Sequence, residues 1–209
     1  QATSNKFLMR ELCKSESITQ PRYQLCRSIH DINYSLNFID YPILFKPLDN
    51  RGSTGVNVIK TKKNIQKKFY ETLIHSNSKE VLLESYIEGK HVSVDSLIDD
   101  EGKTLILGIG EKKHSDKEKK IIIQVNYPAL IDKSSLLNLK NTHNQVIKAL
   151  NITRGISHAE YIIDKKGRPF LIEIASRGGG VLTSCTILKI ISKIDTVDYL
   201  YREALGLKI

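Results

Sequence analysis

The fold is decided by the stretch GISHAEYIIDKKGRPFLIEIASRGGG, residues 155–180. Two apolar runs, residues 155–163 and 170–175, flank the turn sequence DKKG at residues 164–167. A turn this short pairs the two runs as neighbouring antiparallel strands. The stretch therefore predicts a β-hairpin that leads into a glycine-rich connection.

One acid interrupts each strand of this hairpin, Glu160 in the first and Glu173 in the second. Counted from the centre of the turn, Glu160 lies about 5 residues away and Glu173 about 8, so the two need not be directly opposite but can share one sheet face. An unpaired carboxylate on a core-facing position is costly, and a hard cation such as Mg²⁺ removes that cost. The pair therefore predicts a metal site; the alternative is that both side chains point to water.

Arg177 follows the hairpin directly and precedes the glycines at residues 178–180. Its guanidinium is a rigid fork for a phosphate or carboxylate. The glycines open the backbone before a helix, whose start also favours an anion. The alternative is a flexible connector with an exposed arginine.

A second candidate lies earlier, where Lys46 ends an apolar strand over residues 41–46. The turn after it contains two glycines with Ser53 and Thr54 between them. Glycines let backbone N–H groups approach phosphate oxygens, and the hydroxyls are further donors. The order of a P-loop is absent, so an ordinary hairpin remains the alternative.

A third candidate is the segment ESYIEG, residues 84–89, where an acid ends a strand between two groups of elements. A connection between two lobes can present backbone groups to an adenine edge. The alternative is a solvated strand end.

Composition narrows the class of protein. The chain has 209 residues, 40% of them apolar, and no run long enough for a membrane span or a secretory signal. Its three cysteines are far apart, which is typical of reduced thiols in a cytoplasmic protein.

The net charge is +9, but the lysine cluster at residues 112–120 is mixed with acids and lacks interleaved aromatic residues, so nucleic-acid binding is not expected. The six histidines show no zinc-ligand spacing.

Adjacent hairpins combined with helices predict an α+β architecture with antiparallel sheets in two lobes. We expect a leading helix over residues 1–14 that packs on the larger lobe, a small lid lobe over residues 15–87 and a larger catalytic lobe over residues 88–209.

Taken in order, these motifs resemble the ATP-grasp superfamily over nearly the whole chain, in particular the branch with biotin carboxylase, the large subunit of carbamoyl phosphate synthetase and the amino-acid ligases. The resemblance implies ATP held between the two lobes. The nucleotide-binding residues that it implies are Lys6, Lys46, Ser53, Thr54, Gly55, Glu84, Ser85, Tyr86, Ile87 and His91.

The same resemblance assigns roles. Lys6 and Lys46 would bind phosphates, the loop with Ser53, Thr54 and Gly55 would cover them, and the segment from Glu84 to Ile87 would hold the adenine, with His91 near the ribose. Glu160 and Glu173 would bind Mg²⁺, which Mn²⁺ could replace, and Arg177 with Lys46 would act on the transferring phosphoryl group.

One departure from the family's pattern concerns the metal. Ala175 stands where an asparagine is usual, which removes one metal ligand.

The activity that the resemblance implies is that of an ADP-forming ligase, which phosphorylates a small carboxylate and joins the acyl phosphate to an amine or similar nucleophile. Glu111, Lys112 and Lys113 are candidates for the substrate pocket, or plain surface charges.

Relatives carry a preceding α/β domain, so we expect such a domain or a partner chain. A homodimer is another assembly that the chain could form. The alternative function is a nucleotide-binding module or split subunit that needs a partner for catalysis.

Overall fold

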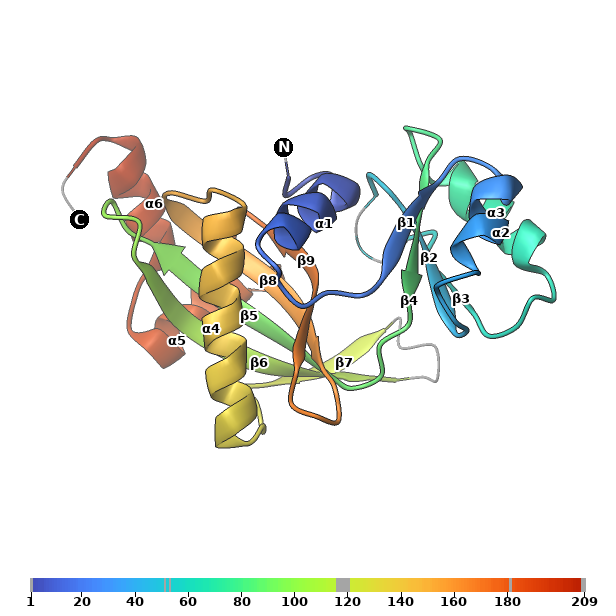
Figure 1. Ribbon diagram of the computed structural model, residues 1–209. Coiled ribbons are helices and arrows are strands. Elements are labelled where there is room, and N and C mark those ends of the chain that lie inside the picture. The colour runs from blue at the N-terminus through green and yellow to red at the C-terminus, as the bar shows by residue number, and fades with distance from the viewer. Residues whose placement is uncertain (1, 51, 53, 116–120, 181, 208–209) are drawn as a thin grey trace.

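The chain folds as an α+β protein with two antiparallel sheets, described by a computed structural model over residues 2–50, 52, 54–115, 121–180 and 182–207 (Figure 1). Its helices are α1 Lys6–Ser15, α2 Ile29–Ser35, α3 Ile65–Ile74, α4 Lys133–Ala149, α5 Leu188–Ser192 and α6 Thr196–Ala204, with a π-helical turn at Thr183–Ile187. Its strands are β1 Tyr23–Cys26, β2 Ile43–Pro47, β3 Asn57–Ile59, β4 Val81–Ser85, β5 Lys90–Ile98, β6 Thr104–His114, β7 Ile122–Asn126, β8 Gly155–Ile163 and β9 Pro169–Ala175.

The smaller sheet has the strand order β1-β4-β2-β3, and helices α2 and α3 pack on one of its faces. Phe45 of β2 and Phe69 of α3 meet edge to face, with ring centroids 6.1 Å apart, in the core between the sheet and the helices. Because alternate residues of a strand point to opposite faces, Leu44 and Lys46 of β2 turn away from this core toward the larger sheet's side of the molecule.

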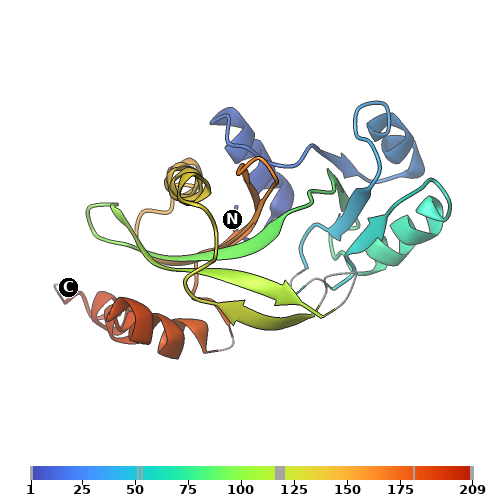
Figure 2. The same cartoon turned by 90° about the horizontal axis from the view of Figure 1, so that it is seen from below.

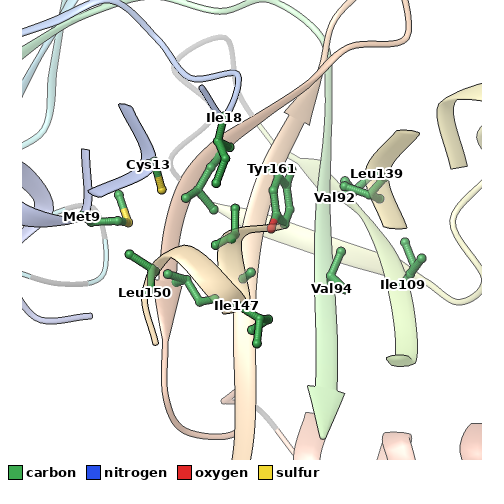
Figure 3. Close-up of a cluster of buried hydrophobic side chains, with 14 of the residues drawn as sticks. Met9, Cys13, Ile18, Val92, Val94, Ile109, Leu139, Ile147, Leu150 and Tyr161 are labelled. Carbon is green, nitrogen blue, oxygen red and sulfur yellow. The ribbon is translucent and has the colours of Figure 1, made fainter. Parts of the chain in front are cut away.

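The larger sheet has the order β7-β6-β5-β8-β9, and α1 and α4 lie on the same face of it (Figures 1 and 2). Their shared core contains Met9 and Cys13 of α1, Leu139 of α4, and Val94 and Tyr161 of the sheet (Figure 3). Helix α1 precedes the smaller sheet in the sequence but packs on the larger one.

Helices α5 and α6 lie on the opposite face of the larger sheet from α4 (Figure 2). There Leu188 and Tyr199 pack against Leu97, Leu107 and Ile156 at one end of the sheet. The remainder of this face lies toward the smaller sheet and carries polar side chains, which form the candidate site described below.

The start of α1 is fixed by its cap. The side chain of Asn5 accepts a hydrogen bond from the N–H of Leu8 at 3.0 Å, as the sequence predicts for a helix beginning here. This start places Lys6 in the first turn and Arg10 one turn later. None of the described helices is long and apolar enough to cross a membrane.

Candidate functional site

The polar face of the larger sheet is built by strand register. Residues directly opposite each other in an antiparallel sheet share a face. Ser93 of β5 lies opposite Glu160 of β8, and Glu160 lies opposite Glu173 of β9. In the next row, Asp95 lies opposite His158. Alternate positions on three strands thus place polar groups side by side.

The two glutamates are directly opposite because of a β-bulge. Leu171 pairs with Tyr161 and Glu173 with Glu160, so Ile172 is the extra residue on β9. The sequence prediction that the glutamates share one face is confirmed. Without the bulge, the register of the hairpin would place Glu160 opposite Ile172 and turn Glu173 to the other face, and no turn or strand pattern in the sequence predicts the bulge.

Glu160 is surrounded by basic side chains. His91 Nε2 lies 3.0 Å from its Oε2, Lys112 donates to its Oε1, and His158 Nε2 lies 3.7 Å from Oε1. Burial alone would raise the pKa of Glu160, but His158, His91 and Lys112 outweigh it and hold the pKa well below the usual range. The carboxylate is therefore ionised, as a metal ligand must be.

Asp95 fixes the orientation of His158. Its Oδ1 lies 2.7 Å from His158 Nδ1, and its side chain is buried. Burial alone would lower the pKa of His158, but the hydrogen bonds with Asp95 and Glu160 raise it to about 9. The imidazole is therefore protonated at neutral pH. Gly179 packs against this pair, because a Cβ there would lie 2.9 Å from His158 Nδ1 and 3.1 Å from Asp95 Oδ1.

Lys46 reaches the site from the smaller sheet, where Glu84 holds it. Lys46 Nζ lies 2.6 Å from Glu84 Oε2, and Arg10 Nε lies 2.7 Å from Glu84 Oε1. The carboxylate of Glu84 is fully buried. Burial alone would raise its pKa, but the charges of Arg10 and Lys46 lower the pKa to about 2. Glu84 is thus a permanent anion that restrains Lys46.

Lys6 reaches the site from the first turn of α1. Its Nζ donates to the backbone carbonyl of Asn50 at 2.5 Å. Burial lowers the pKa of Lys6, Glu173 opposes that effect, and Lys46 adds to it. Lys6 therefore lies near enough to Lys46 for that charge to lower its pKa.

Two adjoining cavities join these groups, and both are lined by Lys6, Asn50, Gly52 and Glu173. The first also contains His158, Ser176 and Arg177 in its wall. The second is the more apolar, and its further lining residues are Leu44, Lys46, Pro47, Thr54, Val56, Val58, Tyr86, Ile87, Gly89, His91, Glu160, Ile162 and Ile172.

Most of the nucleotide- and metal-binding residues predicted from the sequence lie around these cavities, but among the described ones Glu84, Ser85 and Gly55 do not line them. The side chain of Glu84 is engaged by Arg10 and Lys46 instead of facing the cavity. Gly55 lies in a tight turn with φ 76°, where a Cβ would meet the Cβ of His75 at 2.6 Å. Ser53 lies outside the described residues.

The segment predicted to hold adenine is partly committed to other bonds. The N–H of Ser85 donates to the carbonyl of Arg22, and the N–H of Tyr86 donates to the carbonyl of Pro42. Tyr86 and Ile87 line the apolar cavity. These two backbone donors are therefore occupied before any ligand binds.

Three residues of the site had weak or no sequence signals. Arg10 was not singled out, although an arginine between Met9 and Cys13 on the apolar face of a helix is a detectable anomaly. Asp95 has only a weak signal, an acid that follows Val94 within the mostly apolar strand β5. Lys112 was weighed only as a substrate-pocket or surface residue, but it contacts Glu160.

The ATP-grasp domain family matches residues 39–185 of this sequence, which covers more than half of the chain. The chain belongs to the ATP-grasp family. This range contains Lys46, Glu84, Glu160, Glu173 and Arg177, so the motifs and the family assignment rest on the same residues.

Two curated ATP-grasp relatives illustrate the range of the family. A D-alanine–D-alanine ligase from Bacillus cytotoxicus is 23% identical over 190 residues, covering 85% of this chain and 52% of the relative. The carbamoyl phosphate synthase large chain of Clostridium acetobutylicum is 27% identical over 181 residues, covering 84% of this chain and 17% of that protein. The chain thus spans about half, or less, of the length of these relatives.

Solved structures share the ATP-grasp fold. An L-amino acid ligase from Bacillus licheniformis superposes with a TM-score of 0.83 at 23% identity, covering 97% of this chain and 48% of that one. A biotin carboxylase from Campylobacter jejuni, solved as an ATP complex, gives a TM-score of 0.86 at 19% identity, covering 99% and 47%. The predicted fold class is therefore confirmed.

Proposed function

We propose that this chain is the ATP- and Mg²⁺-binding part of a ligase that phosphorylates a small carboxylate and joins the resulting acyl phosphate to an amine or similar nucleophile. The observation that carries the proposal is the directly opposed pair Glu160 and Glu173, which lies beside a cavity lined by Lys6 and Lys46. The ligase activity of ATP-grasp relatives supports the class of reaction.

The more apolar cavity suits a nucleotide. Leu44, Val58 and Ile162 offer apolar contacts to a base, and Tyr86 and Ile87 lie at the connection between the two sheets. Because the N–H groups of Ser85 and Tyr86 are already bonded, we assign the adenine contact to Ile87. Lys6, Lys46 and the turn with Gly52 and Thr54 lie where the phosphates would follow.

The carboxylates fit magnesium delivered with ATP better than a metal held by protein alone. Among the described residues, no group of three or more His, Cys, Asp or Glu side chains could hold an ion. Mg²⁺ usually binds one or two carboxylates, waters and substrate phosphates, so Glu160 and Glu173 are sufficient without an asparagine at position 175. Bound magnesium would neutralise charge on the phosphates; manganese could do the same.

The remaining groups of the site suit acyl phosphate chemistry. Arg177 lines the cavity beyond Glu173, where it would bind the acceptor carboxylate or its phosphate. We propose that an oxygen of the carboxylate attacks the terminal phosphorus and ADP leaves. The amine would then attack the acyl carbon, releasing phosphate and a proton. Positioning and charge neutralisation account for most of such catalysis, and Lys46, Lys6 and the protonated His158 supply the positive charge.

One observation favours a second candidate, a nucleotide-binding module that needs a partner. The chain spans about half of the D-alanine–D-alanine ligase and of the two solved structures named above. In this case ATP would bind without turnover until a preceding domain or partner chain is added.

The test is ADP release with a panel of amino acids and other small carboxylates, each with and without an amine. Substrate-dependent release is the expected result. Glu173→Gln should reduce turnover by about 100-fold or more while the protein remains folded, because one of the two opposed carboxylates is lost. Turnover of Glu173→Gln at the wild-type rate would contradict the metal role. Tight MgADP binding by the wild type without turnover would favour the second candidate.

A further inference from the structure

Arg10 is a fully buried arginine to which the proposed reaction assigns no role. It lies in α1 one turn after Lys6, on the side of the helix that faces the larger sheet, beside the buried Met9 and Cys13. A buried arginine is costly unless its donors are paired. Its partners therefore show what the residue does.

The guanidinium of Arg10 bonds to both sheets. Its Nε donates to Glu84 Oε1 at 2.7 Å in the smaller sheet. Its Nη1 donates to the carbonyl of Leu171 at 2.6 Å, and its Nη2 to the carbonyl of Ile172 at 3.1 Å, both on β9 of the larger sheet. Three elements distant in sequence thus converge on one side chain.

The partners of Arg10 in each sheet contact or adjoin a residue of the proposed site. Glu84 holds Lys46 Nζ at 2.6 Å, so Arg10 acts on the phosphate-binding lysine through one shared carboxylate. Ile172 is the extra residue of the β-bulge that brings Glu173 opposite Glu160, and Leu171 directly precedes it. Strand β9 is the outermost strand of the larger sheet, so its outward carbonyls have no partner strand, and Arg10 supplies donors for these two.

We propose that Arg10 is a positioning residue that sets the distance between Lys46 and Glu173, and that it thereby couples the affinity for nucleotide to the affinity for divalent cation. The inference rests on the function proposed above. A phosphate chain bound at Lys46 reaches a metal at Glu173 only when both groups are held at the correct separation. Arginine suits this role because its planar fork donates in several fixed directions at once, whereas lysine does not.

The test measures ADP binding by calorimetry in Mg²⁺ and in EDTA, for wild type, Arg10→Met and Arg10→Lys. The ratio of the two dissociation constants reports the coupling. We expect a ratio of about tenfold or more in the wild type, and a ratio within about threefold of unity in both variants. Arg10→Lys keeps a cation for Glu84, so it should retain more thermal stability than Arg10→Met.

Arg27→Met is the matched control. Arg27 also pairs with a glutamate, Glu80, at 2.6 Å at one end of the smaller sheet, just after β1 and just before β4, but its side chain is 71% exposed and lines neither cavity of the site. This variant should keep the wild-type ratio.

A purely structural role for Arg10 would lower the melting temperature and weaken binding equally in both conditions, leaving the ratio unchanged. A wild-type ratio in either folded Arg10 variant, or failure of both variants to fold, would overturn the positioning role. Absence of ADP binding by the wild type would instead refute the proposed function, on which this inference depends.

Discussion

Replacement of Glu84 by glutamine should destabilise the protein strongly, although glutamine has nearly the same shape. Glu84 is fully buried between Arg10 and Lys46, with contacts of 2.7 and 2.6 Å. Its pKa falls from the usual 4.5 to about 2, which corresponds to about 3 kcal/mol. Removing one partner of a buried ion pair typically costs ~3–5 kcal/mol. We therefore expect a loss of about 3 kcal/mol in the free energy of unfolding at pH 7.

The assay is equilibrium urea denaturation, with Glu80→Gln as the matched control. Glu80 pairs with Arg27, whose side chain is 71% exposed, so its loss should cost about 1 kcal/mol or less. Acid provides a second comparison. Because the folded-state pKa of Glu84 is lowered, its stabilising contribution is complete above pH 4.5 and is lost as the pH falls toward 2. The difference between wild type and Glu84→Gln should shrink over that range.

Two results would refute this reasoning. A loss below about 1 kcal/mol for Glu84→Gln would show that the ionised carboxylate contributes no more than an exposed pair. A difference from wild type that stays constant between pH 7 and acid would show that its protonation is not linked to folding.

Two further predictions concern a buried histidine and a strained turn. His143 is hydrogen-bonded to Tyr161, and burial lowers the pKa of His143 to about 3. The stabilising contribution of the neutral imidazole is therefore complete above pH 6.5 and is lost as the pH falls toward 3. In urea denaturation, His143→Gln should reduce the fall in the free energy of unfolding over this range by up to about 1.4 kcal/mol per pH unit. Gly55→Ala should lower the free energy of unfolding by ~2–4 kcal/mol, because its φ is 76° and a Cβ would lie 2.6 Å from that of His75. Gly52→Ala, with φ 63° and open space around it, should cost only about 1 kcal/mol, and equal losses in the two glycine variants would contradict this explanation.

Local sequence patterns were sufficient for the elements that carry the site. The alternation around Glu160, the turn at residues 164–167 and the acid at Glu173 specify a hairpin with one acid in each strand, whereas the bulge at Ile172 puts both acids on one face. These features depend on strand periodicity and turn chemistry, which act over a few neighbouring residues. The same kind of local rule placed the cap at Asn5.

The contacts of Glu84 could not be predicted in this way. Its sequence position is typical of a strand end, and the expectation was a carboxylate near adenine. In the folded chain it is the shared anion of Arg10, 74 residues earlier, and Lys46. Such a pairing depends on where α1 lies relative to both sheets, which no local pattern contains.

By itself, the sequence determined the α+β class, the order of the strands along the chain and the residue types of a nucleotide and metal site. Only the tertiary structure decided that Ile172 is bulged, that Glu160 and Glu173 are directly opposite, and that Arg10 joins both sheets. The physical reason is that periodicity and turns are encoded by neighbouring residues, whereas register shifts and buried ion pairs minimise unpaired charge and unpaired backbone over the whole packed chain. The phosphate-binding and metal-binding residues are present in the sequence, but their separation is set by the packing of α1 between the two sheets.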